Sequence, residues 1–261
     1  SGGYGRAVIL NRGNANAATG PRGRADAEAM GEAVARHLAR PAEEVLVCST
    51  GLIGIPLPID KVLAGVPDLL AARGASPEHA TAAAEAIRTT DTHGKEAVAT
   101  AGVATVGGMA KGAAMLAPNM ATMLAVCTTD AEASPEVLRR IVKAAVDASF
   151  NVLDVDGCTS TNDTVILMAS GAAGPVDADV LQAAVTEVCT NLAAQMAGDA
   201  EGATKTVRVE VTGADSDADA AAVARAIAPS QHVKCYRYGE DPYWGRVARE
   251  ARSAGVRFDP S

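Results

Sequence analysis

The sequence predicts an α+β layered sandwich, and two observations lead to that fold class. Short runs rich in Val, Ala, Leu and Ile, typical of buried strands, recur between longer segments with the 3.6-residue period of helices. They do not form a repeating strand–helix unit with phosphate-loop glycines, which disfavours a doubly wound parallel sheet. The 261-residue chain is long enough for one large domain or two closely packed ones.

The N-terminal part of the chain predicts strands and helices in alternation. Residues 7–10 (AVIL) form an apolar run that opens into turn-forming residues, and residues 45–48 (VLVC) form a second buried strand. Helices are expected at 26–39, 60–72 and 77–87, where apolar side chains recur with a helical period.

Two later segments have the composition of strands. Residues 97–106 are rich in Val, Thr and Ala without a helical period, and Gly107 and Gly108 are expected to form a turn or bulge after them. Residues 206–211 (TVRVEV) alternate with period two, which predicts a strand with one solvated face.

The remaining elements complete the layered pattern. Ser134 is a suitable N-cap and Pro135 a suitable first residue for a helix. The other expected strands are 122–127 and 165–168, and the other expected helices are 135–148, 177–197 and 219–227.

Composition and charge restrict the classes of partner. The sequence is 48% hydrophobic but only 3% aromatic, so a core of small aliphatic side chains is expected. The formal net charge of -8 argues against nucleic acid, because phosphate binding needs clustered Lys and Arg. The sequence has neither an apolar run long enough to cross a membrane nor a signal peptide, so a cytoplasmic protein with no membrane partner is expected.

The five cysteines indicate neither a disulfide framework nor a zinc site. Their number is odd, they are widely spaced, and they contain no Cys-x-x-Cys pair. They are expected to be small buried residues in a reducing compartment. No metal site is expected.

Five ordered segments carry the functional signal. They are STG at 49–51, TTDT at 89–92, KGAAMLAPNMATML at 111–124, DVDGCTSTNDT at 154–164 and DAEGATK at 199–205. In this order they resemble the bifunctional glutamate/ornithine acetyltransferase family of arginine biosynthesis, over about residues 7–260. The resemblance implies a self-cleaving, amino-terminal-nucleophile-like fold and a chain that lacks family segments at both ends.

The resemblance also implies that the chain cleaves itself between Ala121 and Thr122. Residues 1–121 would then be the upstream fragment and residues 122–261 the downstream fragment of one catalytic unit. A threonine hydroxyl is a weak nucleophile, but a Thr at a new chain terminus has its own α-amine as a base. Cleavage would therefore create the catalytic nucleophile.

Further site residues are implied by matching family motifs. Thr50 and Gly51 match the oxyanion pair, and a strand that ends in a small hydroxyl residue and Gly can present backbone N–H groups to an anion. Thr89, Lys111, Thr122 and Glu201 match the substrate contacts, with Thr90 as the candidate adjacent to Thr89. Lys111 can neutralise a substrate α-carboxylate, and Glu201 can pair with an amine.

Two other site types do not fit the sequence. Asp154 and Asp156 resemble a calcium loop, but Gly157 comes too early and no Glu closes the ligand set. The four histidines have no identifiable nucleophile partner for a Ser-His-Asp triad. No cofactor is expected.

The expected reaction is ping-pong acetyl transfer from N2-acetylornithine to glutamate through acetyl-Thr122, with acetyl-CoA as a possible second donor. Cleaved pairs are expected to form a homo-oligomer. One alternative is an amidase or aminopeptidase, with water as acceptor. The other is an inactive, shortened homologue that acts as a binding subunit; cleavage at Ala121/Thr122 would favour an enzyme.

Overall fold

The computed structural model describes residues 2–117 and 123–257 and confirms an α+β layered fold. The strands are β1 (Ala7–Asn11), β2 (Val45–Ser49), β3 (Lys95–Ala101), β4 (Ala104–Lys111), β5 (Leu124–Glu132) and β6 (Thr164–Pro175). The helices are α1 (Gly20–Leu38), α2 (Ile59–Ala71), α3 (Pro77–Ala86), α4 (Pro135–Ala148), α5 (Ala178–Gly198), α6 (Asp217–Ile227), α7 (Gln231–Tyr238) and α8 (Gly245–Ser253). Short 3₁₀ turns cover Ala42–Glu44 and Phe150–Val152.

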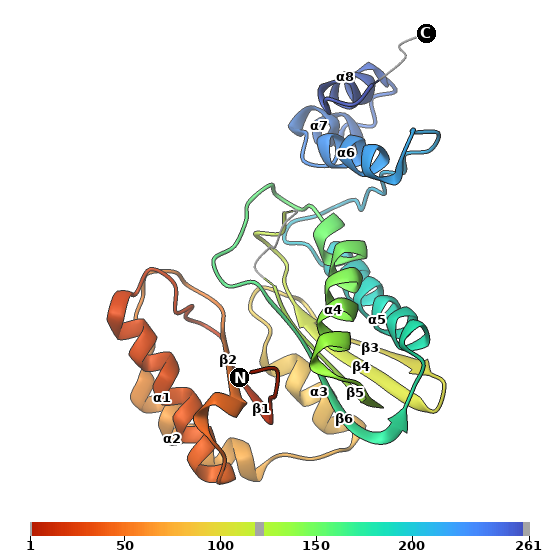
Figure 1. The fold of residues 1–261 in the computed structure, drawn as a ribbon. Coiled ribbons are helices and arrows are strands. Elements are labelled where there is room, and N and C mark those ends of the chain that lie inside the picture. Colours follow the sequence, from red (N-terminus) through yellow and green to blue (C-terminus); the bar gives the residue numbers. More distant parts are fainter. Residues whose placement is uncertain (1, 118–122, 258–261) are drawn as a thin grey trace.

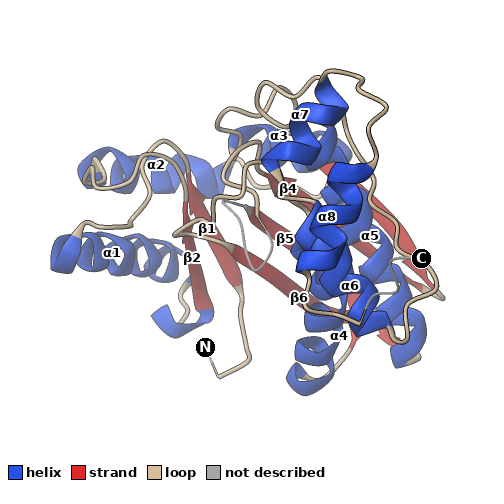
Figure 2. Cartoon of the chain, turned by 90° about the horizontal axis from the view of Figure 1, so that it is seen from above, coloured by secondary structure: helices blue, strands red, loops and turns tan. Residues whose placement is uncertain are grey.

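The strands form two separate sheets. A four-stranded sheet has the order β3-β4-β5-β6, with β3, β4 and β5 antiparallel and β6 parallel to β5. The short strands β1 and β2 form a parallel pair. Helices α4 and α5 lie side by side on one face of the four-stranded sheet, and α3 lies behind it (Figure 1). Helices α1 and α2 pack together beside the β1–β2 pair, as Figure 2 shows from above.

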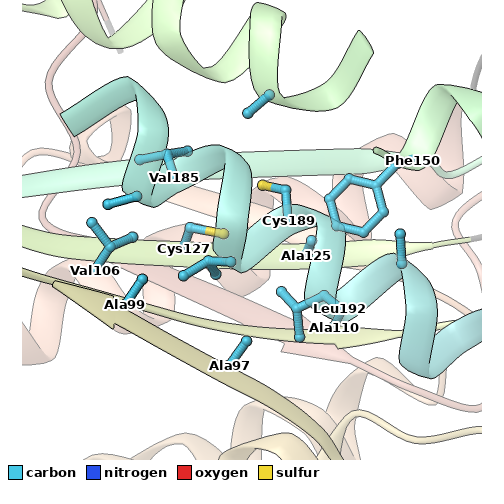
Figure 3. Close-up of a cluster of buried hydrophobic side chains, with 14 of the residues drawn as sticks. Ala97, Ala99, Val106, Ala110, Ala125, Cys127, Phe150, Val185, Cys189 and Leu192 are labelled. Atoms are coloured by element: carbon cyan, nitrogen blue, oxygen red, sulfur yellow. The ribbon is translucent and has the colours of Figure 1, made fainter. Parts of the chain in front are cut away.

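The main core lies between α4, α5 and the four-stranded sheet. Alanines of the strands, among them Ala97, Ala99 and Ala125, face α5 side chains such as Val185 and Leu192 (Figure 3). This layer of small side chains confirms the expectation from composition. It also lets the helix approach the sheet closely.

The expected strand at 97–106 was wrong in one respect. The segment contains parts of two strands, because the chain turns at Gly102 and Val103 and pairs β3 with β4. Gly102 has a φ of +62°, a conformation that favours glycine. Gly108, expected in a turn, lies inside β4, where a Cβ would come within 2.7 Å of Val188 on α5. Its small size therefore serves helix packing.

The expected strand at 206–211 was also wrong. These residues have no regular secondary structure, because no described strand pairs with them and an alternating sequence needs a neighbour to form a ladder. Helices α7 and α8 were not expected at all. Helix α1 begins at Gly20, ahead of the expected start at residue 26, since Pro21 supplies an early helical position.

The expectation for the cysteines holds for only some of them. Cys48, Cys127 and Cys189 are buried, whereas Cys158 and Cys235 are exposed. Cys158 lies in the loop before β6 and Cys235 lies on the solvent-exposed side of α7, so neither side chain packs in a hydrophobic core. All five are free thiols.

Candidate active site

The candidate active site is built at the ends of strands from both sheets. Thr50 follows β2 and is 1% exposed, and Lys111, the last residue of β4, is 2% exposed. Lys111 Nζ donates a hydrogen bond to Thr50 Oγ1 at 3.3 Å, across 61 positions of sequence. The structure thus brings together two of the site residues that the sequence predicts.

Gly51 makes a turn that only glycine fits. Its φ is +130°, and a Cβ would lie 2.3 Å from the backbone carbon of Gly13. The neighbouring Leu52 N–H donates to Gly13 O at 3.0 Å, which ties this turn to the loop after β1. Within the described chain the Gly51 N–H has no acceptor.

Thr50 can contribute a different donor from the one expected. Its backbone N–H already donates to Asn11 O at 3.0 Å and continues the β1–β2 ladder. Its hydroxyl oxygen accepts from Lys111, which leaves the hydroxyl proton free to donate. The potential anion donors at this turn are therefore the Thr50 hydroxyl and the Gly51 N–H.

Lys111 is a buried ammonium with few partners. Burial lowers its pKa, the carboxylate of Asp91 opposes that effect, Lys95 adds to the lowering, and Asp163 opposes it. Within the described chain its only hydrogen bond is to Thr50. An ammonium has three donors, so Lys111 can bind a carboxylate in addition.

Asp163 is a site residue to which the sequence analysis gave no role. Its Oδ1 accepts the Met123 N–H at 3.0 Å, and the Thr164 N–H donates to Met123 O at 3.1 Å. Burial raises the pKa of Asp163 to about 6, although bonds from Met123 and Ser160 and the charge of Lys111 oppose the rise. Strand register is the signal that could have indicated it. Thr164 pairs with Leu124, so Asp163 and Met123, which precede these two residues, lie side by side.

The expected cleavage site lies outside the described residues. Ala121 and Thr122 both belong to the segment 118–122, which the structure does not describe. The chain is described again from Met123, which is buried and held by Asp163.

The other expected substrate contacts lie on segments that meet near Lys111. The exposed Thr89 donates its N–H to Asp91 Oδ2 at 3.1 Å, and Gly112, next to Lys111, donates its N–H to Asp91 Oδ1 at 2.7 Å. The exposed Glu201 donates its N–H to Ala113 O at 2.7 Å. Thr90 is exposed on the same loop as Thr89.

The described residues contain no group of three or more His, Cys, Asp or Glu side chains arranged to hold a metal ion. Within the described chain, none of the helices has both the length and the apolarity that a membrane crossing requires.

Comparison with known proteins identifies the family. The model of the ArgJ family matches residues 1–261. The chain belongs to the ArgJ family. It is 51% identical over 256 residues to the arginine biosynthesis bifunctional protein ArgJ of Thermobifida fusca, covering 98% of this chain and 66% of that protein. It is 52% identical over 263 residues to the ArgJ of Mycolicibacterium paratuberculosis, covering 98% and 65%. This ArgJ-family chain thus spans just under two thirds of the length of these relatives.

Two solved structures are also similar to parts of the chain. The ArgJ of Bacillus halodurans is 39% identical with a TM-score of 0.48, covering 51% of this chain and 65% of that one. The ornithine acetyltransferase of Mycobacterium tuberculosis, solved in complex with ornithine, is 44% identical with a TM-score of 0.37, covering 43% and 61%.

Proposed function

We propose that this chain transfers an acetyl group from N2-acetylornithine to glutamate by a ping-pong mechanism, with Thr122 as the acetyl carrier. The observation that carries the proposal is the buried contact between Lys111 and Thr50, which puts an ammonium beside the Gly51 turn. Membership of the ArgJ family supports the same reaction class. The relatives named above are bifunctional proteins of arginine biosynthesis.

Maturation begins at the bond between Ala121 and Thr122. The Thr122 hydroxyl attacks the Ala121 carbonyl, an ester C–O bond forms as the C–N bond breaks, and the Thr122 nitrogen takes up a proton. Water then hydrolyses the ester, which restores the hydroxyl and leaves Ala121 with a carboxylate. Thr122 is now a chain terminus with its own amine as base.

Acetyl transfer then takes two half-reactions. The α-amine of Thr122 accepts the hydroxyl proton as the oxygen attacks the acetyl carbonyl of N2-acetylornithine, and ornithine leaves with that proton. The amine of glutamate attacks acetyl-Thr122, and the hydroxyl is restored. Each step passes through an oxyanion, for which the Gly51 N–H and the Thr50 hydroxyl are the proposed donors.

The buried charge of Lys111 suits an amino-acid substrate. Its unused donors would bind the α-carboxylate of ornithine or glutamate, and little water competes at a side chain that is 2% exposed. Glu201, on the exposed segment bonded to Ala113, would pair with the side-chain ammonium of ornithine. Thr89 would complete the substrate contacts.

Two other functions remain as alternatives to transfer. An amidase on the same scaffold would pass the acetyl group to water, so it would release acetate at the same rate with or without glutamate. An inactive binding subunit would neither cleave itself nor form an acyl intermediate. The expected partners are therefore small molecules, with acetyl-CoA as a candidate donor and a homo-oligomer of cleaved pairs as the candidate assembly.

The test is to incubate the chain with acetyl-labelled N2-acetylornithine, quench with acid and locate the label by peptide mass. Label on the peptide that begins at Thr122, and its loss on adding glutamate, is the expected result. Lys111→Met should reduce labelling strongly, whereas Lys61→Met on the exposed face of α2 should not. Absence of label from the Thr122 peptide in the unaltered chain would overturn the proposal.

A further inference from the structure

A buried ionic triad lies behind the candidate site. Lys95 Nζ, at the start of β3, is 2.7 Å from Asp91 Oδ1 and 2.6 Å from Asp199 Oδ2. Asp91 lies in the loop before β3, and Asp199 follows the last residue of α5. The three side chains are almost completely buried, so three charges are held together away from water.

The carboxylates of the triad also hold backbone groups of nearby segments. Asp91 accepts the N–H groups of Thr89 and Gly112. Asp199 accepts the N–H of Thr92 at 2.9 Å and also its hydroxyl. Burial would raise the pKa of each carboxyl, but these bonds and Lys95 outweigh it and bring the pKa of Asp199 down to about 2. Both carboxyls are therefore ionised at neutral pH.

Each segment that the triad holds carries a candidate substrate contact. Thr89 is bonded directly to Asp91, Lys111 precedes the bonded Gly112, and Glu201 follows Asp199 by two positions. We propose that the Asp91–Lys95–Asp199 triad is a positioning device that fixes Thr89, Lys111 and Glu201 relative to one another for amino-acid binding. This inference rests on the proposed function, which supplies the substrate roles of those three residues.

A stabilising role alone does not account for the triad. Buried ion clusters can often be replaced by uncharged residues of similar volume without loss of stability, and the main core of small side chains already joins α5 to β3 and β4. Charged groups do, however, fix direction and distance, since each bond has a narrow geometry. The Asp91 carboxylate also favours the charged form of the buried Lys111, which an uncharged replacement would not.

The test uses the full chain and measures binding as well as transfer. The first variant combines Asp91→Asn, Lys95→Met and Asp199→Asn, which removes the charges together and leaves no carboxylate unpaired. The second, Asp91→Asn alone, leaves a neutral pair of Lys95 and Asp199 and is the safeguard if the first does not fold. The matched control is Lys143→Met with Asp147→Asn, an exposed ion pair on α4. Titration calorimetry gives the Kd of L-ornithine and of putrescine, which is ornithine without its carboxylate.

The positioning role predicts a rise of about 10- to 100-fold in the Kd of ornithine for the triple variant, with circular dichroism and Tm unchanged. Asp91→Asn should reduce the preference for ornithine over putrescine, because Lys111 is no longer fixed in position to bind the carboxylate of ornithine. The control should bind both ligands as the unaltered chain does.

Three results would overturn the inference. The first is an unchanged Kd of ornithine in both variants. The second is an equal loss of affinity for ornithine and putrescine together with a lowered Tm. The third is no ornithine binding by the unaltered chain. If the unaltered chain binds ornithine but forms no acetyl-Thr122, only the proposed reaction is refuted. The comparison of ornithine and putrescine binding still decides the role of the triad.

Discussion

Two regions of the molecule bury their side chains differently. The sheet body is the four-stranded sheet with α3, α4 and α5, and the C-terminal helical segment is residues 206–257. The sheet body encloses the main core and the ionic triad. The C-terminal helical segment has a small buried cluster of Ile227, Val233, Tyr236 and Ala251. Figure 1 shows its three helices gathered beyond the end of α5, away from the sheet.

One ion pair from the sheet body and one from beside the C-terminal helical segment show the same difference. Lys95 in the sheet body has no exposed side-chain area, whereas the Lys205–Glu240 pair beside α7 is open to solvent. Buried charges are restricted to one geometry and exposed ones are not. The candidate site residue Lys111 ends strand β4 of the sheet body, and Thr89 lies in the loop that leads into β3. Four predictions test this contrast.

The largest expected effect is that of Lys95→Met alone. This change leaves two buried carboxylates unpaired, which should lower the free energy of unfolding by ~3–5 kcal/mol. Lys205→Met in the exposed pair should change it by less than ~1 kcal/mol. Urea denaturation of both variants measures the difference. Equal losses would contradict the contrast between the two regions.

Removal of a core side chain should give the next largest effect. Leu192 is fully buried between α5 and the sheet, so Leu192→Ala should cost ~2–5 kcal/mol. Ile227→Ala in the C-terminal helical segment should cost less than ~2 kcal/mol, because a small cluster can collapse around the gap. Thermal unfolding followed by circular dichroism compares the two, and a larger loss for Ile227→Ala would reverse the order proposed here.

Asp163 should make stability depend on pH. Its folded-state pKa of about 6 lies above the ordinary aspartate pKa of 3.8, so the folded chain binds the proton more tightly than the unfolded chain. Its contribution is full below pH 4 and is lost as pH rises through 6. Lowering the pH from 7 to 5 should therefore raise the free energy of unfolding by at most ~1 kcal/mol relative to Asp163→Asn, after allowance for partial solvent screening. Parallel pH profiles for the two proteins would exclude this contribution.

The smallest effect is expected where the sequence predicted a strand that the structure lacks. Val207 is exposed and its segment makes no ladder, so Val207→Pro should cost less than ~1 kcal/mol. Val126→Pro, at a matched alternating position inside β5, should prevent folding because it removes a hydrogen bond between central strands. A large loss for Val207→Pro would show that residues 206–211 pair with another strand after all.

These cases show which parts of the structure local sequence determines. The β1 and β2 runs and the Ser134 cap of α4 were predictable because their signals lie within a few residues, and Ser134 Oγ does accept the Val137 N–H at 3.3 Å. The 206–211 strand was not, because pairing depends on a neighbour that alternation cannot reveal.

The candidate site follows the same rule. Family motifs indicated Thr50, Gly51, Thr89, Lys111 and Glu201 one by one. The bond from Lys111 to Thr50 joins the ends of β2 and β4, and the bond from Met123 to Asp163 joins the starts of β5 and β6. Such contacts arise from strand register and tertiary packing, which a single sequence does not specify.

The central claim is that chain scission turns Thr122 into the nucleophile, and the intact mass of the denatured protein tests it most directly. Two fragments that meet between Ala121 and Thr122 are expected for the unaltered chain, and one uncut chain is expected for Thr122→Ala. An uncut unaltered chain, or the same two fragments from Thr122→Ala, would contradict it.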